Sequence, residues 1–259
     1  MKSQPGQATH MILGEQVMEE LGTGQAHVAS AWLPSGQRVL EIGCSTGYLT
    51  RHFLGKAEQV CGLDMNASAL SCAKRRHPNV PFVCGSAEHL PFADDSYDAI
   101  VMLEVLHHTG SDVTAVAEVR RILKVGGTLI LSTPNAGLFA FLDPFNLKRA
   151  IQRRFPISYG VAERLVRYES SQFTDNLVWQ RHYRLEELTS LLERDFSIRA
   201  VYRGGLLLYP LMAVSISVGA RLWISPAALR WMFRLSNWDF RRRFGLLSYN
   251  MMILAKRMR

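Results

Sequence analysis

Residues 38 to 50 read R-V-L-E-I-G-C-S-T-G-Y-L-T, and this stretch decides the fold. An apolar run from Val39 to Ile42 comes first, a glycine-bearing segment follows, and helical spacing then places Phe53 and Leu54 on one buried side. This order predicts a buried strand, a tight turn and the start of a helix. In doubly wound α/β proteins such a turn lies at the carboxyl edge of the sheet, where ligands of the nucleotide type bind.

A carboxylate ends the next apolar run. Asp64 lies 21 positions after Gly43 and directly follows the run Val60 to Leu63. An acidic side chain at this place can accept hydrogen bonds from both hydroxyls of a ribose. The turn and the carboxylate together therefore predict a site for a ligand that carries a ribose.

The segment from Gly43 to Gly47, G-C-S-T-G, fits three interpretations. It matches the G-x-S-x-G nucleophile elbow of α/β-hydrolases, but only 42 residues precede it and no HGGG-like segment lies upstream. A dinucleotide fingerprint requires glycine at relative positions one, three and six, where this chain has Gly43, Ser45 and Tyr48. An adenosyl ligand without phosphates needs only two small positions and an acidic residue in the next strand.

The segment E-I-G-C-S-T-G, together with Asp64, resembles the class I methyltransferases that bind S-adenosylmethionine. More narrowly, it is similar to the branch of quinone-pathway and generic small-molecule enzymes, the methyltransferase type 11 group. The usual turn in that family is G-C-G-x-G. Ser45 is a departure from it, and places a Cβ where the backbone approaches the methionine part of the donor.

Three later segments carry the same resemblance. G-S-A-E-H-L-P-F from Gly85 resembles the family segment G-D-A-x-x-L-P-F beside the adenine, with Ser86 in place of the usual aspartate. S-Y-D-A-I-V-M-L-E-V-L-H-H-T from Ser96 resembles the motif of the fourth strand. L-K-V-G-G-T-L-I-L-S-T-P-N from Leu123 resembles the fifth.

The resemblance implies S-adenosylmethionine as the cofactor and several loops as its binding site. Glu41 would orient the methionine end through the backbone of the turn, and Asp64 would hold the ribose. Residues just past the fourth strand would lie between the methyl donor and the acceptor. The residues expected to bind the donor are Glu41, Gly43, Cys44, Gly47, Asp64, Met65, Ser86, Ala87, Leu103 and Glu104.

Three side chains are candidates for contact with the acceptor, in the catalytic part of the site: His107, His182 and Tyr183. The sulfonium of S-adenosylmethionine is already an activated methyl donor, so a phenolate or activated carbon needs no strong general base. The sequence can therefore lack a catalytic dyad. A histidine at a loop-to-helix junction is more often a structural hydrogen-bonding group, so both roles stay open for His107.

Charge is unevenly distributed along the chain of 259 residues. The net charge is +8, but ten basic residues and one acid from Val201 onward sum to +9, so the first 200 residues sum to −1. This asymmetry is typical of contact with an anionic membrane or with nucleic acid. RNA methylation is one alternative, but the arginines lie among apolar residues and no RNA-binding module is visible, which disfavours nucleic acid. A non-catalytic, membrane-associated protein of the same fold is another, because of Ser45 and Ser86.

Cysteine spacing and the N-terminal segment indicate the compartment. Cys44, Cys61, Cys72 and Cys84 show neither a C-x-x-C motif nor a metal-ligand spacing, so we expect reduced thiols and no metal site. The first ten residues are polar and lack the apolar core of a signal sequence. These features predict a cytoplasmic protein.

The alternation of apolar runs predicts one α/β domain over the whole chain, with a doubly wound, Rossmann-like sheet. The resemblance implies seven strands, mostly parallel with the last antiparallel, and two mainly helical insertions over the active-site edge. We expect the core to comprise residues 30–135, 182–203 and 247–257. Residues 136–181 form the first insertion, a lid or acceptor pocket, because a structureless loop of that length is improbable in a compact domain. Residues 204–246 form the second.

The second insertion is first apolar and then basic. Residues 204–220 carry no charge over 17 positions but contain Pro210 and three glycines, so a membrane span is disfavoured. Ser225-Pro226 then predicts the start of a helix. Its basic and polar stripe is expected to be Arg230, Arg234, Asn237 and Arg241, with Met232 and Leu235 opposite and Trp231 and Trp238 at the margins. Peripheral membrane contact through 204–243, a homodimer surface and an internally packed lid all fit this pattern.

These patterns together predict a methyltransferase that acts on a lipophilic small molecule, such as a quinone precursor, a polyketide or a lipid-linked sugar. The methylated atom is expected to be an oxygen or a carbon. The acceptor would enter from the bilayer surface at the cytoplasmic face of the membrane, because both insertions rise over the carboxyl edge of the sheet.

Overall fold

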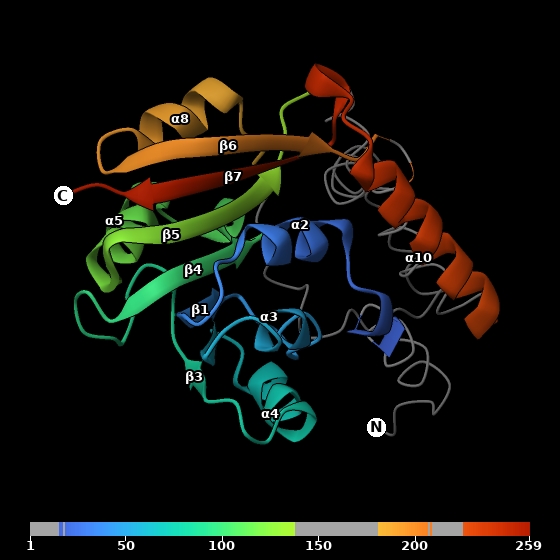
Figure 1. Cartoon of the computed structure of the whole chain (residues 1–259), viewed down its shortest axis with the longest axis horizontal. Helices are drawn as coiled ribbons and strands as arrows, with labels where there is room; N and C mark the ends of the chain where they lie inside the picture. Colours follow the sequence, from blue (N-terminus) through green and yellow to red (C-terminus); the bar gives the residue numbers. More distant parts are fainter. Residues whose placement is uncertain (1–15, 18, 138–180, 207, 209–224) are drawn as a thin grey trace, which may run out of the picture.

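The computed structural model describes residues 16–17, 19–137, 181–206, 208 and 225–259. A seven-stranded sheet with the order β3-β2-β1-β4-β5-β7-β6 runs through the molecule (Figure 1). β7 is antiparallel to both β5 and β6, and the other neighbouring strands are parallel. The predicted doubly wound, mostly parallel sheet with an antiparallel last strand is confirmed.

The strands are β1 (Arg38–Ile42), β2 (Gln59–Asp64), β3 (Phe82–Cys84), β4 (Tyr97–Leu103), β5 (Leu123–Pro134), β6 (Phe196–Gly204) and β7 (Asn250–Arg257). The helices are α2 (Gly24–Trp32), α3 (Arg51–Leu54), α4 (Ala67–Arg76), α5 (Asp112–Ile122), α8 (Leu185–Leu192) and α10 (Pro226–Arg241). Two short 3-10 helices are η1 (Leu106–His108) and η3 (Gly245–Leu247).

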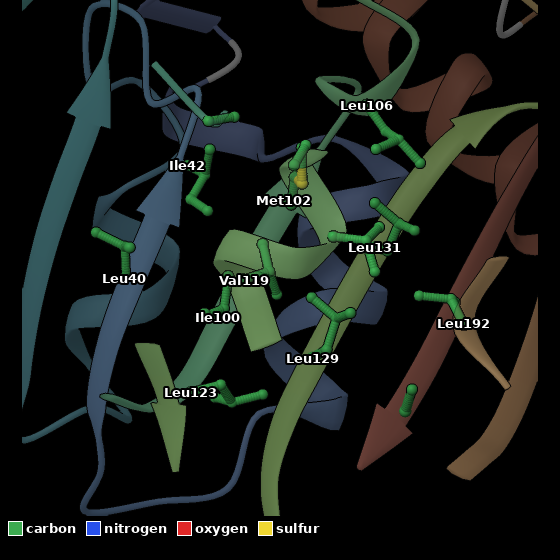
Figure 2. Close-up of a cluster of buried hydrophobic side chains, with 14 of the residues drawn as sticks. Leu40, Ile42, Ile100, Met102, Leu106, Val119, Leu123, Leu129, Leu131 and Leu192 are labelled. Carbon is green, nitrogen blue, oxygen red and sulfur yellow. The ribbon is translucent and has the colours of Figure 1, made fainter. Parts of the chain in front are cut away.

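Apolar side chains cover both faces of the sheet, because helices pack on both. Side chains alternate along a strand, so Ile100 and Met102 of β4 point to one face, while Ala99 and Val101 point to the other. The first face packs under α5 and α8, and Figure 2 shows part of this cluster. The second face packs under α2, α3 and α10. The sheet therefore forms the middle of three layers.

Side-chain caps fix where the helices begin. Thr23, Asn66, Ser111 and Ser225 each accept a backbone N–H from the first turn of α2, α4, α5 and α10. The helix start predicted at Ser225-Pro226 is confirmed. The helix predicted after the first turn is only the single turn α3, in which Phe53 is buried but Leu54 is 39% exposed. The prediction that Leu54 is buried was wrong, because α3 ends there.

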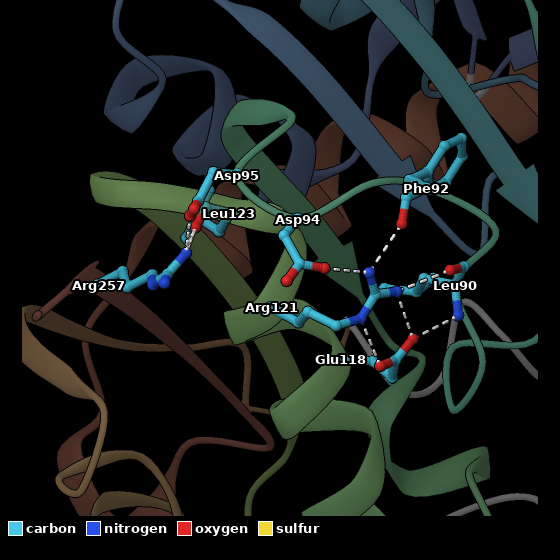
Figure 3. Close-up of polar contacts among 8 residues, drawn as sticks. All are labelled: Leu90, Phe92, Asp94, Asp95, Glu118, Arg121, Leu123 and Arg257. Carbon is cyan, nitrogen blue, oxygen red and sulfur yellow. Dashed lines mark hydrogen bonds and ion pairs between the residues drawn. The ribbon is translucent and has the colours of Figure 1, made fainter.

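An arginine holds the segment that leads from β3 into β4. Arg121 of α5 donates to the carbonyls of Leu90 and Phe92 and pairs with Glu118 and Asp94 (Figure 3). The guanidinium thus satisfies two carbonyl groups outside the sheet ladder. The chain consequently enters β4 from a fixed position.

α10 packs against α2, although some 200 residues separate them in sequence (Figure 1). A Cβ on Gly24 would lie 2.4 Å from the ring of Phe240, so the close contact requires glycine. The side-chain amide of Asn237 donates to the carbonyl of Gly22 at 2.9 Å. Asn237 is therefore buried and not part of an exposed stripe, which corrects the prediction for this residue.

The predicted insertions are described only in part. Residues 138–180 and 209–224, which include most of the first insertion and most of the apolar stretch, lie outside the described residues. Within the described segments, no helix has the length and apolar character needed to cross a membrane. The domain boundaries stay a prediction.

Candidate functional site

The turn after β1 contains three residues with positive φ: Gly43 (74°), Ser45 (48°) and Gly47 (75°). The backbone N–H groups of Gly43 and Cys44 both donate to the carbonyl of Leu63 near the end of β2, at 2.7 and 3.1 Å. Glycine adopts this left-handed conformation without steric cost, whereas a serine loses about 1 kcal/mol or more. The residue that departs from the family's turn is therefore also a strained one.

Substitution of Ser45 by glycine is expected to raise the free energy of unfolding by about 1 kcal/mol, because the positive φ is then unstrained. It should also tighten binding of S-adenosylmethionine, because a Cβ is removed from the turn. Urea denaturation and calorimetry measure the two effects. Ser45→Ala is the control, since it keeps the Cβ and the strain, and a loss of stability in Ser45→Gly would contradict the prediction.

Asp64 connects this turn to the end of β2. Its Oδ2 accepts the N–H of Ser45 at 2.8 Å, and its Oδ1 accepts the N–H of Asn66 at 2.9 Å. A carboxylate has about four lone-pair positions, so about two remain for other donors. Asp64 is only partly buried. The carboxylate therefore fits the two hydroxyls of a ribose while it also fixes the turn.

The neighbours of Gly43 and Asp64 differ in exposure. Cys44 is buried, and this burial raises the pKa of its thiol far above the usual range, so the thiol stays protonated. It can contribute packing and its backbone to the site, but not a thiolate. Met65 is 79% exposed directly after Asp64. Its flexible side chain is available to pack on a ligand held by the carboxylate.

Glu41, in β1, forms a hydrogen bond with the residue that precedes α3. Its side chain is buried, and its Oε2 accepts the hydroxyl of the fully buried Thr50 at 2.6 Å. Burial raises the pKa of Glu41 to about 7, the hydrogen bond from Thr50 opposes this, and the charge of Asp64 raises it further. Glu41 therefore joins the last residues of β1 to the start of α3, which agrees with an indirect effect on the donor.

This pKa predicts a pH dependence of stability. The folded protein holds the Glu41 proton more tightly than the unfolded chain, so stability falls as the pH rises from about 4.5 to about 7. The contribution amounts to about 3 kcal/mol at most. Glu41→Gln keeps an acceptor for Thr50 but cannot ionise. The stability of Glu41→Gln relative to that of the wild type should therefore be higher at pH 8 than at pH 4.5.

Urea denaturation at the two pH values measures this difference. Glu58→Gln, at an exposed position before β2, is the matched control and should leave the pH dependence unchanged. If Glu41→Gln also leaves the pH dependence of stability unchanged, the prediction of a raised pKa for Glu41 is wrong.

β4 ends beside the same turn. A Cβ on Gly43 would lie 2.2 Å from Cγ2 of Val105, so the loop after β4 contacts the turn after β1 directly. Glu104, which follows the half-buried Leu103, has a φ of 57°. Strained backbone of this kind is found preferentially at functional sites. The two predicted parts of the donor site therefore meet.

The carboxylate of the half-buried Glu104 is the centre of a hydrogen-bond network. Its Oε1 accepts from Gln25 Nε2 (2.8 Å), Ser132 Oγ (2.8 Å) and Asn250 Nδ2 (2.7 Å). Burial raises the pKa of Glu104, while these hydrogen bonds oppose the rise. The network joins α2, β5 and β7 to the end of β4. Glu104 could be predicted from the sequence, but its partners could not, because 79, 28 and 146 positions separate them from it.

The loop after β3 is fixed by its own polar groups. Ser86 Oγ accepts the N–H of Glu88 at 3.2 Å, and Ala87 is buried. Glu88 Oε1 in turn accepts the N–H of Ser111, the cap of α5, at 2.6 Å. The segment expected beside the adenine is therefore tied to the loop after β4.

The two candidate histidines lie at different places. His107 is buried in η1, and its ring centre lies 4.0 Å from that of His108. His182 is half-buried, with its ring centre 6.3 Å from that of Tyr249, just before β7. His107 thus follows the donor strand β4, whereas His182 lies two strands further along the sheet. Contact of either side chain with an acceptor stays a prediction.

Tyr183 is held by the core. Its ring is 2% exposed and its hydroxyl donates to Asp112 Oδ2 at 3.3 Å. Burial and the charge of Asp112 raise the pKa of Tyr183 to about 12, so it is neutral at physiological pH. Its backbone pairs with Asn135 after the end of β5. Tyr183 therefore lies at the carboxyl edge of the sheet, where the donor site is expected. Its contact with an acceptor also stays a prediction.

In the part of the chain that the structure describes, no group of three or more His, Cys, Asp or Glu side chains could hold a metal ion. Cys44, Cys61, Cys72 and Cys84 are all free.

Comparison with known proteins gives matches over the same region. A family model described as methyltransferase domain matches residues 40–131. Demethylmenaquinone methyltransferase of Renibacterium salmoninarum is 35% identical over 119 residues, which cover 45% of this chain and 50% of that protein. Phthiotriol/phenolphthiotriol dimycocerosates methyltransferase 1 of Mycobacterium ulcerans is 40% identical over 102 residues, 37% of each chain. The chain thus spans half or less of the length of these relatives.

A solved structure extends the likeness to nearly the whole chain. The S-adenosylmethionine dependent methyltransferase from Mesorhizobium loti superposes with a TM-score of 0.58, covering 91% of this chain and 99% of that one at 17% identity. This likeness concerns the fold. The family model, in contrast, covers all the expected donor residues from Glu41 to Glu104 and ends before both predicted insertions.

Proposed function

The chain belongs to the class I S-adenosylmethionine-dependent methyltransferases, and we propose that it transfers the methyl group of this cofactor to an oxygen or carbon of a lipophilic small molecule. The observation that carries the proposal is the carboxyl edge of the sheet. There the turn of residues 43–47, the partly open carboxylate of Asp64 and the strained Glu104 come together.

The donor side of the site uses residues with distinct tasks. Asp64 has lone pairs left for the ribose hydroxyls, and Glu41 holds the end of β1 against Thr50. The half-buried Ser86 and the backbone of Ala87 would meet the adenine. When bound, the cofactor supplies a methyl group on a positively charged sulfur. The protein's task is then to align an acceptor atom with that methyl group and to exclude water.

The acceptor class is inferred from relatives and from composition. Two matched relatives are named for demethylmenaquinone and for phthiotriol or phenolphthiotriol dimycocerosates, which are lipophilic molecules. The chain is itself 48% hydrophobic, and its net positive charge is concentrated from Val201 onward. These features support a quinone precursor, a polyketide or a lipid-linked sugar as acceptor, taken from the cytoplasmic face of a membrane.

The test uses S-adenosylmethionine with a labelled methyl group. The full chain is incubated with a demethylated quinone, a phenolic polyketide, a lipid-linked sugar or RNA, and the label is counted after extraction with organic solvent. Label in the organic phase supports the proposal, and label in the RNA supports nucleic acid as acceptor instead. Absence of donor binding in calorimetry would leave only a binding protein of this fold.

A further inference from the structure

The outer face of α10 carries two exposed tryptophans. Trp231 is 62% exposed and Trp238 is 53% exposed. They are seven residues apart, which is about two helical turns, so they lie on one face. Arg234 and Arg241 are also exposed, each three residues after one of the tryptophans. Exposure of such large apolar side chains to water is unfavourable unless another molecule covers them.

Among the described residues, Arg230 of α10 pairs with Glu20, whereas Arg234, Arg241 and Arg242 form no ion pair. Arg242, just after α10, is exposed, and its guanidinium lies 4.8 Å from the centre of the Trp238 ring. Asp239 is the one acidic residue from Ser225 to Arg259, and it is buried, where it accepts the N–H of Leu206. The carboxylate therefore points into the protein while the arginines point out.

Exposed apolar side chains continue into η3. Leu246 is 73% exposed and Leu247 is 42% exposed. Arg243, between α10 and η3, forms a β-bridge with Gly204 at the carboxyl end of β6. β6 runs parallel to β5 and hence to β1, so this is the edge of the sheet that also carries Asp64. The exposed residues thus reach the edge where the donor site lies.

We propose that this α10 surface, defined by Trp231, Arg234, Trp238, Arg241, Arg242 and Leu246, docks on the anionic face of a phospholipid bilayer. Guanidinium groups bind lipid phosphates, and tryptophan prefers the boundary between headgroups and acyl chains. Exposed leucines gain from burial in the acyl region. Docking itself does not depend on the proposed function. Only the statement that the acceptor would reach the site from the same bilayer rests on it.

Charge favours a bilayer over a second copy of the chain. A two-fold dimer through the α10 surface would place Arg234 and Arg241 close to the same arginines of the other copy, which is unfavourable. Single-stranded RNA would also offer phosphates and bases, but it has no apolar phase for Leu246 and Leu247. An anionic bilayer provides both kinds of contact at once.

The test is flotation of the full chain with vesicles of phosphatidylcholine, with or without added phosphatidylglycerol. The chain should float only with the anionic vesicles, and less at high salt, because salt screens the arginines. Arg234→Ala with Arg241→Ala should reduce the bound fraction about tenfold. Trp231→Ser with Trp238→Ser should reduce it about as much, because the anchoring rings are lost. All four side chains are exposed, so both double variants should fold.

The matched control removes the same charge elsewhere. Arg194 and Arg199 are exposed on the turn before β6 and on β6 itself, and Arg194→Ala with Arg199→Ala should float as the wild type does. Docking is refuted if the wild type does not float with anionic vesicles, or if the control loses as much binding as the α10 variants. It is also refuted if sedimentation shows a dimer that the tryptophan variant abolishes, or if RNA retards the chain and vesicles do not.

Calorimetry with S-adenosylmethionine on the same preparations separates this inference from the proposed function. A chain that binds the donor but does not float refutes docking alone. A chain that floats and binds the donor but methylates no lipophilic acceptor supports docking and refutes the proposed function.

Discussion

Asp64→Ala is expected to weaken binding of S-adenosylmethionine about 100- to 10,000-fold. Two hydrogen bonds from ribose hydroxyls to a carboxylate contribute about 1.5 to 3 kcal/mol each. The sum of about 3 to 6 kcal/mol corresponds to about two to four powers of ten in the dissociation constant, at about 1.4 kcal/mol for each. The same substitution removes the acceptor for the N–H groups of Ser45 and Asn66, which loosens the turn in addition.

Calorimetry measures the affinity, and circular dichroism checks that the variant is folded. Asp98→Ala is the matched control, because Asp98 also accepts a backbone N–H, that of Arg38 at 2.9 Å, and pairs with Lys124. It lies at the amino end of β4, on the opposite edge of the sheet. It should cost stability and leave donor affinity unchanged. If Asp64→Ala binds the donor like the wild type, the ribose does not lie on this carboxylate.

The sheet could be predicted from sequence because its signals are local. Each strand of a parallel sheet covered on both faces is a short, continuous apolar run, as in Val60 to Leu63. The cap at Asn66 and the start of α10 at Ser225-Pro226 are equally local. The end of α3 was missed because Leu54 continues the apolar spacing although the helix stops there.

The donor side of the site was predictable for a similar reason. The turn at residues 43–47 and Asp64 belong to one strand–helix–strand unit, in which the spacing along the chain fixes the spacing in space. The strain at Ser45 could not be read from composition, because only the φ angle reveals it. The burial of Asn237 was missed since helical periodicity does not show that a second helix covers one part of a polar stripe.

Contacts between distant segments explain the remaining omissions. Gln25 and Asn250 reach the same oxygen of Glu104 from the two ends of the chain. Neither residue belongs to a motif, and a glutamine in a helix such as α2 is usually a surface residue. Only the strand order, which places β7 beside β5 and close to β4, brings them together.

That network leads to the second large effect. Glu104→Ala is expected to lower the free energy of unfolding by about 3 to 5 kcal/mol, because it leaves three buried donors without their acceptor. The midpoint of thermal unfolding should fall by about 10 °C in a chain of this size. Glu104→Gln retains an acceptor oxygen and should lose about 1 kcal/mol. Thermal and urea unfolding of the two variants measure the difference.

The pH dependence of Glu104→Ala and Glu104→Gln shows whether the side chain at position 104 acts as an ionisable carboxylate or only fills space. Because the pKa of Glu104 is raised in the folded protein, its contribution to stability falls as the pH rises above about 4.5, the value in the unfolded chain. The stability of Glu104→Gln should therefore approach that of the wild type as the pH increases. Glu118→Ala is the control, since Glu118 also accepts several hydrogen bonds, but its hydrogen bond with Arg121 lowers its pKa, so its contribution to stability is lost as the pH falls and not as it rises. Equal losses in Glu104→Ala and Glu104→Gln at every pH would mean that a side chain of the same shape with one acceptor oxygen does not suffice, and that the carboxylate itself joins α2 and β7 to the end of β4.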